Sequence, residues 1–477
     1  MMSGVMVVFT LPLLAALLVY LLRRWPLPSA IFAGLAALFL GWLLWRWPNG
    51  ETVLFLGRVL RVDAPVQLLG QTFALGPTAQ WVLGWLAVVL AAAYLGAWRV
   101  SPGRTFFPFG LVLWSLFGAV LTLQSLWLAP ILLALVMAVA TFVIQAGRQG
   151  STRGALRALW LPVLAIPLFL LAAWYIEQTP LDPENTQTLQ AAGQFASVGL
   201  FLLLAPWPLH APAVSLGEEG PPLVAAWLLT ALAATAVTLL QGLLVQFQWL
   251  QGAALSYTLP TVRLAELLLY GGMATCLWAG LAGAVQTNLS RQWSYASLFT
   301  YGAVLIALGL GAQGSWALVW LLLVGRGVAM IVSAYGLAVI RQRAGGLTDF
   351  VHVQGLGTRL PWASMAFLVG MLSLAGMPLT AGFPGQWALM QALGSHDWYQ
   401  VVVVLAGALG LVVGLMRSLS ALLGPLRNLL LEREERVTIV LAAVGLLAIL
   451  APALYPAIWQ DSLNAVVAVF AAASGGL

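Results

Sequence analysis

Apolar stretches of about 20 residues recur from one end of the chain to the other, and they constrain its fold more than any other feature. A helix of that length crosses a hydrocarbon core of about 30 Å. Only 7% of the 477 residues are charged, whereas an ordinary globular chain carries roughly 25%. Because so few charges cannot cover a water-soluble surface, the sequence predicts an all-α integral membrane protein with about fourteen transmembrane helices.

The segments between the apolar stretches are short. Apolar and β-branched residues interrupted by Asp-Ala-Pro and glycine predict an external hairpin at 47–76. Residues 177–190 are expected to form an acidic external loop, and residues 340–359 the one sizeable cytoplasmic loop. None of these could hold a folded catalytic domain, so any chemistry must take place inside the helix bundle. We place the spans at 4–22, 27–46, 77–98, 106–124, 126–146, 156–176, 191–210, 221–246, 258–285, 292–312, 315–339, 360–393, 399–422 and 437–458.

The arginines are distributed unequally between the two sides of these spans. Only Arg46, Arg58 and Arg61 fall on one side. By the positive-inside rule the other side is cytoplasmic, which predicts a bacterial-type inner membrane protein with both termini on the outer side. The net charge of +6 is therefore an orientation signal and not a sign of nucleic-acid binding. The arginines of the predicted cytoplasmic side are Arg23, Arg24, Arg99, Arg104, Arg148, Arg153, Arg157, Arg291, Arg341, Arg343, Arg359, Arg417, Arg427, Arg433 and Arg436.

Two of the spans contain clusters of helix-breaking residues. The first is FLLLAPWPLHAP at 201–212, and the second is LAGMPLTAGFPGQW at 374–387. Prolines remove backbone donors and disrupt the helical ladder. Interrupted helices at corresponding points of two halves are typical of an inverted-repeat transporter core. The alternative is an ordinary pair of proline kinks, since proline is common in membrane helices.

At these residues the chain resembles a known family. TNLSRQWSYASLFTYG (287–302) resembles the DLKRLLAYSTISxxG segment of the antiporter-like subunits of respiratory complex I. PWASMAFLVGMLSLAGMPLTAGFPGQW (361–387) is similar to the broken twelfth helix of that family, with its LAGxPxxxGFxxK signature. PLH at 208–210 and EGPP at 219–222 resemble its PLHxWLPDAH…APT stretch. The resemblance covers roughly 75–425 and extends to the related Mrp-type complexes.

The resemblance implies a fold of fourteen helices with two inverted five-helix repeats and discontinuous helices 7 and 12. It divides the chain into N-terminal helices 1 to 3 with the hairpin (1–105), a first repeat (106–257) and a second repeat (258–423). A cytoplasmic linker and helix 14 follow (424–477). The implied partners are other polytopic subunits of a multisubunit membrane complex, with lipid around them and with protons or water as possible cargo.

The chain departs from the family at the positions that carry protons. The resemblance implies that family members that pump place a glutamate in helix 5, lysines in helices 7 and 8, and a lysine or glutamate in helix 12. The corresponding residues here are Ala134 in helix 5, Leu203 in helix 7 and Gln386 in helix 12. No charged residue lies between Glu219 and Arg263, so the helix 8 lysine has no substitute, and the chain contains no lysine at all. Since arginine stays charged and cannot release a proton as buried lysine can, the pathway is predicted to be lost or strongly altered.

Few charges remain within the predicted membrane, and each has two interpretations. Arg326 lies near the middle of its span, close to the family's helix 11 lysine. We expect it to face the bundle interior and meet a polar partner, either as a structural ion pair or helix-end clamp or as a remnant of the pathway. Arg263 and Glu266 are three apart and can form a structural pair with each other. The alternative is a rerouted proton path, for which the candidates are Arg326, His210, Gln386, Glu266 and Arg263. His210 is expected at the cytoplasmic face, as a vestigial proton-entry group or as a cap on exposed carbonyls.

No catalytic or cofactor site is legible. The single cysteine excludes a disulfide or a thiolate cluster, and no metal-binding spacing, phosphate loop or nucleophile–base pair is present in the sequence. Three functions stay open. The favoured one is a non-catalytic membrane-arm subunit of a complex I-like NADH:quinone oxidoreductase, mainly structural or coupling in role. The others are an active proton or cation translocator using Arg326, His210 and water, and a membrane partner of a hydrogenase, cation/proton antiporter or inorganic-carbon uptake complex.

Overall fold

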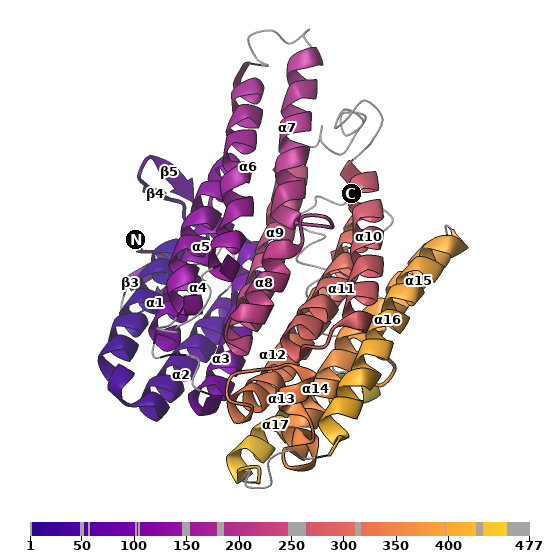
Figure 1. Ribbon diagram of the computed structural model, residues 1–477. Helices are drawn as coiled ribbons and strands as arrows, with labels where there is room; N and C mark the ends of the chain where they lie inside the picture. Colours follow the sequence, from indigo (N-terminus) through magenta and orange to yellow (C-terminus); the bar gives the residue numbers. More distant parts are fainter. Residues whose placement is uncertain are drawn as a thin grey trace.

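Among the residues that the structure describes, seventeen α-helices account for most of the chain. In this computed structural model the long helices lie side by side and roughly parallel (Figure 1). Ten described helices are long and apolar enough to cross a membrane, which confirms an all-α integral membrane protein. The described residues are 2–47, 52–55, 58–100, 103, 105–145, 153–178, 186–246, 264–310, 316–395, 397–425 and 433–455.

Each of the fourteen predicted spans coincides with one long helix or with two half-helices, so the structure is compatible with fourteen crossings. The long helices are α1 (Gly4–Leu21), α2 (Pro26–Arg46), α3 (Pro77–Val100), α4 (Phe106–Thr122), α5 (Ala129–Gln145), α6 (Arg153–Gln178), α7 (Thr186–Leu204), α9 (Pro222–Gln246), α10 (Leu264–Val285), α11 (Leu289–Gly309), α12 (Trp316–Arg343), α16 (Trp398–Leu423) and α17 (Arg436–Leu454). The short ones are α8 (Ala211–Glu219), α13 (Phe350–Val353), α14 (Pro361–Leu374) and α15 (Phe383–Gly394), with 3-10 turns at Leu22–Arg24, Leu126–Leu128 and Leu356–Thr358.

The region predicted as a single external hairpin contains two separate pairs of strands. Strand β2 (Thr52–Phe55) pairs antiparallel with β3 (Arg58–Arg61), and β1 (Met2–Ser3) joins β3 in parallel. Strands β4 (Val66–Leu68) and β5 (Gln71–Phe73) form the second antiparallel pair. Leu69 and Gly70 connect β4 to β5 with φ angles of 51° and 74°, the positive values that a two-residue hairpin turn requires. The prediction of one hairpin was therefore wrong in number.

Helices α9 and α12 form the centre of the bundle. Helix α12 packs against α3, α9, α11, α14, α15 and α17. In the most apolar 18-residue segments of α9 and α12, 89% and 83% of the residues are buried inside the protein. In the corresponding segments of α6 and α17 only 22% and 28% are buried. A polar side chain on α9 or α12 must therefore find its partners inside the protein.

Both predicted interruptions are present. Between α7 and α8 the chain leaves the helix at Ala205, which has a φ of 46°. The amide of Trp207 in this first break donates a hydrogen bond to Thr275 Oγ1 of α10 at 2.8 Å. Since Pro206 and Pro208 have no amide hydrogen, this loop leaves few donors to satisfy. The first break is thus held in place by a helix of the second half of the chain.

The second break lies between α14 and α15. Gly376 and Leu379 in this loop have φ angles of 74° and 64°. The amide of Gly382, the residue before α15, donates to Ser373 Oγ near the end of α14 at 3.0 Å. The two half-helices are thereby joined across the interruption by a side chain.

Candidate functional site

Arg326 is the only charged residue among those described that is buried, with 3% of its surface exposed. It lies in the interior of α12, at the centre of the bundle. Its Nη1 donates to the Leu229 carbonyl of α9 at 3.2 Å, and its Nε donates to the Ser297 carbonyl of α11 at 3.4 Å. The guanidinium carbon lies 5.7 Å from the centre of the Tyr301 ring. Two carbonyl dipoles and one aromatic face therefore solvate this charge.

The charge of Arg326 has no carboxylate partner among the described residues. An ion pair and a helix-end clamp were the two structural roles considered for it. The described contacts match neither, since Arg326 is inside its helix and bonds only to carbonyls. The carbonyls belong to α9 and α11 and not to a broken helix. Among the residues that the structure describes, Arg326 is thus the one buried positive charge at the centre of the bundle.

A cavity of about 100 Å³ separates Arg326 from the first break. Leu203 and Ala205 line it from the break, and Arg326 and Tyr301 line it from the opposite side. In helix α5 the lining residue is Leu133, and its neighbour Ala134 is not part of the wall. Apart from one serine, Arg326 and Tyr301, the described lining is apolar. The cavity offers no group that exchanges a proton readily near neutral pH.

The residue before Arg326 contacts the second break. A Cβ atom on Gly325 would lie 2.9 Å from the carbonyl oxygen of Ala381, so only glycine allows this approach. Residues 325 and 326 of α12 therefore lie between the two interruptions, one facing each. The middle of α12 therefore contacts the second break and faces the first break across the cavity.

Gln386 lies just beyond the second break on α15. It is 4% exposed, and neither Oε1 nor Nε2 of its side-chain amide has a hydrogen-bond partner among the described residues. A Cβ atom on Gly376 would lie 2.3 Å from its Cγ, so the amide side chain packs directly on that glycine. A glutamine can bind water but cannot hold an extra proton at neutral pH.

His210 lies at the first break, as the N-cap residue of α8. It immediately precedes α8, which separates it from Glu219. Trp278 Nε1 of α10 donates to His210 Nε2 at 3.1 Å, so this nitrogen is an acceptor and the ring is neutral in this geometry. His210 does not line the Arg326 cavity. Glu266 lies in the first turn of α10, and its expected partner Arg263 is outside the described residues.

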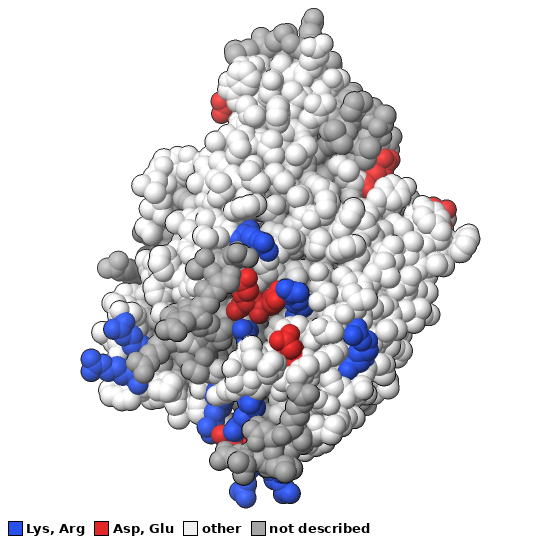
Figure 2. All heavy atoms as spheres, in the orientation of Figure 1, with Lys and Arg blue, Asp and Glu red and all other residues white. Residues whose placement is uncertain are grey.

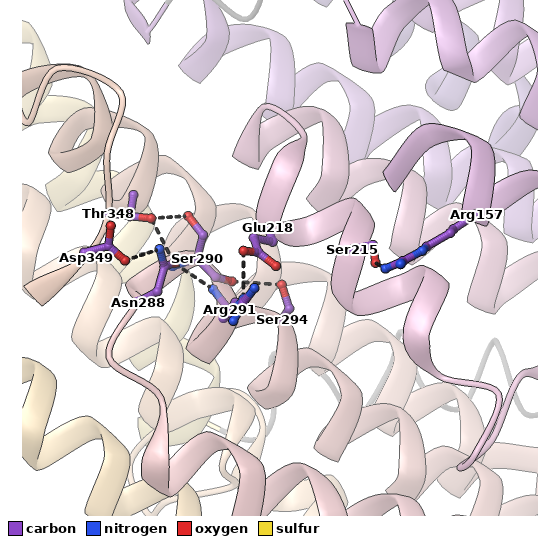
Figure 3. A network of polar contacts seen from close by, with 9 residues as sticks. All are labelled: Arg157, Ser215, Glu218, Asn288, Ser290, Arg291, Ser294, Thr348 and Asp349. Atoms are coloured by element: carbon purple, nitrogen blue, oxygen red, sulfur yellow. Dashed lines mark hydrogen bonds and ion pairs between the residues drawn. The ribbon is translucent and has the colours of Figure 1, made fainter. Parts of the chain in front are cut away.

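A polar network joins the two halves of the chain beyond the hydrophobic spans (Figure 3). Glu218 at the end of α8 accepts a hydrogen bond from Arg291 Nε of α11 at 2.7 Å. Asn288 caps α11, because its side-chain Oδ1 accepts a hydrogen bond from the backbone amide of Ser290 at 2.9 Å. The side-chain Nδ2 of Asn288 donates to Asp349 Oδ1 at 3.0 Å. The end of α8, the start of α11 and the loop before α13 are thereby tied together.

Helix α8 is also bonded to α6 and to α12. Arg157 Nη1 of α6 donates to Ser215 Oγ at 3.0 Å. Arg341 Nη1, near the end of α12, donates to the Gly220 carbonyl at 2.8 Å. The half-helix that follows the first break is therefore fixed to helices of both halves.

Residues 166–413, more than half of the chain, match the model of the NADH:quinone oxidoreductase/Mrp antiporter transmembrane family. The chain belongs to this family. This antiporter-like chain is 27% identical over 311 residues to the NADH-quinone oxidoreductase subunit N of a Nocardioides species, covering 60% of the chain and 56% of that relative. It is 28% identical over 372 residues to subunit N 1 of Solidesulfovibrio magneticus, covering 72% and 76%.

The antiporter-like chain spans only about half the length of the first of these relatives. A solved structure with the same fold is respiratory complex I from Thermus thermophilus with bound NADH. One of its chains superposes with a TM-score of 0.73 at 18% identity, covering 99% of this chain and 100% of that one. At this identity the likeness establishes the fold alone.

Sequence reasoning missed three residues that shape these sites in the antiporter-like chain. Tyr301 faces Arg326, and Glu218 pairs with Arg291. Tyr301 and Arg291 lie within the TNLSRQWSYASLFTYG motif that marks the family. The motif drew attention to the segment, but nothing in it indicated which residues of other helices it would meet.

Proposed function

We propose that the chain is a membrane-arm antiporter-like subunit of a complex I-like quinone oxidoreductase, and that its own proton pathway is lost. Its role is then to hold the arm together and to transmit movement between neighbouring parts. The observation that carries this proposal is the apolar cavity at the first break, which holds a fixed arginine charge and no residue that titrates near neutral pH.

The charge of Arg326 opposes cation entry. A proton or cation in the cavity would stand within a few ångströms of the guanidinium. At about 4 Å and an effective dielectric constant of about 20, two like charges repel by about 4 kcal/mol. Since about 1.4 kcal/mol corresponds to a factor of ten, conduction would slow by about a thousandfold. Leucine at 203 adds an apolar wall where a family member carries a lysine, and dry constrictions block ion flow.

The coupling role rests on the bonds around α8. A movement of this half-helix would be transmitted to α11 through Glu218 and Arg291, and to α12 through Arg341. Single surface ion pairs contribute little stability, typically below about 1 kcal/mol. The value of this set therefore lies in fixing the position of α8 and not in stabilising the fold.

The proposed orientation places both termini on the outer side of an inner membrane. On the face seen in Figure 2, the upper part shows acidic side chains but no basic ones, and the basic ones gather lower down. This asymmetry supports the positive-inside assignment. Reporter fusions at residue 345 and at the C-terminus are expected to read opposite sides. A reading on the same side would refute the topology, and a stable lone monomer would refute the partnership.

Reconstitution of the intact complex tests the proposed loss of the pathway. We expect Gln386→Ala and His210→Ala to leave the proton flux per turnover unchanged. The matched control is Gln400→Ala, a buried glutamine of α16 that lines neither break. If either test variant abolishes pumping while the control and the assembly are intact, the subunit conducts protons. A sodium-dependent flux would instead favour the cation/proton antiporter function.

A further inference from the structure

The cavity beside Arg326 contains a positive charge that no described residue neutralises. The guanidinium donates to the carbonyl oxygens of Leu229 and Ser297, and the centre of the Tyr301 ring lies 5.7 Å from its carbon. These partners solvate the charge, but none of them carries a negative charge. None of the described residues that line the cavity is acidic. Because Coulomb attraction is stronger in an apolar interior than in water, this charge attracts a mobile anion.

Hydrogen-bond donors are available to such an anion. The Nη2 group of Arg326 and the hydroxyl groups of Ser297 and Tyr301 make no hydrogen bond to any described residue. Ser297 and Tyr301 lie at positions i and i+4 of α11, which places them on one face of that helix. Both residues line the cavity together with Arg326. Since Arg326 and Ser297 are only 3% and 2% exposed, these donors are shielded from bulk solvent.

The wall and the volume of the cavity suit a small ion. Helices α5 to α9, α11 and α12 all contribute residues to the wall, so the site is built by this chain alone. A volume of about 100 Å³ exceeds the roughly 10–15 Å³ that one water molecule needs, which leaves room for an ion of similar size and a few waters. A monovalent anion would form a neutral pair with one guanidinium, whereas a divalent anion would leave an uncompensated negative charge in an apolar site.

We propose that the cavity binds one monovalent anion of halide size, held by the Arg326 guanidinium and by the hydroxyls of Ser297 and Tyr301. Arginine suits this role because its guanidinium stays charged and is more weakly hydrated than an ammonium group. Its charged N–H groups form stronger hydrogen bonds to an anion than neutral donors do. The remaining wall is apolar, which favours a weakly hydrated halide over a strongly hydrated ion.

Anion binding goes beyond the proposed function and is compatible with it. Without the anion, the guanidinium repels a cation in the cavity. With the anion, the space between Arg326 and the wall formed by Leu203 and Ala205 is occupied. Both states therefore oppose the passage of a cation past the first break. Binding of a halide does not depend on proton flux, so the two proposals can fail separately.

Anomalous diffraction from crystals of the intact complex soaked in sodium bromide tests the position of the site. A bromide peak is expected between Arg326 and Tyr301. Unfolding temperatures measured in bromide, with gluconate added to keep the ionic strength constant, test the affinity, because an anion that binds only the folded protein stabilises it. In Arg326→Gln the half-saturating bromide concentration should rise at least about tenfold, since the charged donor is lost. Arg326→Lys keeps the charge and should retain a saturable bromide effect.

A second pair of variants tests the cavity without removing the charge. Ala213 of α8 lines the cavity, so Ala213→Leu should fill it and abolish the bromide peak. The matched control is Ala211→Leu on the same helix, because Ala211 is exposed and is not part of the wall. Equal elution profiles of the complexes would show that assembly is not the cause.

The outcomes decide the proposal directly. A peak that is lost in Arg326→Gln and Ala213→Leu but kept in Ala211→Leu would support it. The absence of a bromide peak from the wild-type cavity would overturn it, and so would a peak that persists in Arg326→Gln. Stabilisation by acetate without any effect of bromide would show that the site takes a carboxylate and not a halide. Each of these results is read from ion binding, so none of them decides whether the subunit conducts protons.

Discussion

Replacing Arg326 with methionine separates a structural clamp from an electrostatic barrier. Burying an unpaired charge costs several kcal/mol. Two hydrogen bonds from the charge, both long at 3.2 and 3.4 Å, return about 1.5 kcal/mol each. The Tyr301 ring at 5.7 Å adds about 1 kcal/mol. Because these terms nearly cancel, Arg326→Met should change the free energy of unfolding by less than about 2 kcal/mol.

The assay is reversible unfolding in a detergent series, with Leu323→Ala as a reference on the same helix. Leu323 is 2% exposed, so its truncation should cost about 2–5 kcal/mol. If Arg326→Met is as destabilising as Leu323→Ala, the arginine is a clamp and the electrostatic reasoning is wrong. If it is near neutral, stability does not explain a buried charge at the centre of the bundle.

The functional half of this prediction uses restored pathway residues. In a variant carrying Ala134→Glu, Leu203→Lys and Gln386→Lys, the proton flux should stay low while Arg326 is present. Adding Arg326→Met should raise it, by up to about a thousandfold if the repulsion of about 4 kcal/mol is removed in full. Equal flux with and without Arg326 in otherwise assembled complexes would refute the barrier.

Three further changes have defined outcomes. Gly280→Ala should disrupt the packing of α10 on α16, because the new Cβ would lie 2.1 Å from a carbonyl oxygen. The control Gly34→Ala meets nothing within 4 Å and should be neutral or stabilising. Thermal unfolding compares the two variants. Burial raises the pKa of the Glu434 carboxyl above 4.5. The contribution of this group to the free energy of unfolding is therefore fully present below that value, and stability falls as the pH rises through the raised pKa. Glu434→Gln should remove this slope in unfolding curves between about pH 4 and pH 7. A double-mutant cycle on Glu218 and Arg291 should give a coupling energy below about 1 kcal/mol that decreases with salt, since the two side chains are 30% and 51% exposed. A larger coupling energy that does not depend on salt would contradict a surface ion pair.

The positions of the helices could be predicted because they depend on local sequence. Apolar length marks each span, and the prolines of residues 201–212 and 374–387 mark each break, since a missing amide disrupts a helix wherever it lies. The hairpin region shows the limit of this reasoning. Its turn at Leu69 and Gly70 has a local cause, but the pairing of β3 with the N-terminal strand β1 joins residues far apart in the chain.

The candidate site was predicted only in part. Arg326 was expected to be buried, because an arginine in the middle of an apolar span is costly to expose to lipid. Its partners could not be predicted, since Ser297 and Leu229 lie 29 and 97 residues away and offer only carbonyls that every residue has. The contact of His210 with Trp278, 68 residues further along the chain, could not be predicted from the sequence either.

The sequence by itself determined that this chain spans a membrane, where its helices lie, where two of them break and which family it belongs to. Only the tertiary structure decided which helices are neighbours, and therefore that Arg326 lacks a described counter-charge, that Leu203 faces it across a cavity, and that Glu218 meets Arg291. The physical reason is that lipid and protein interior are equally apolar. Hydrophobicity therefore drives helices into the membrane but does not select their partners, which close packing and a few polar contacts decide.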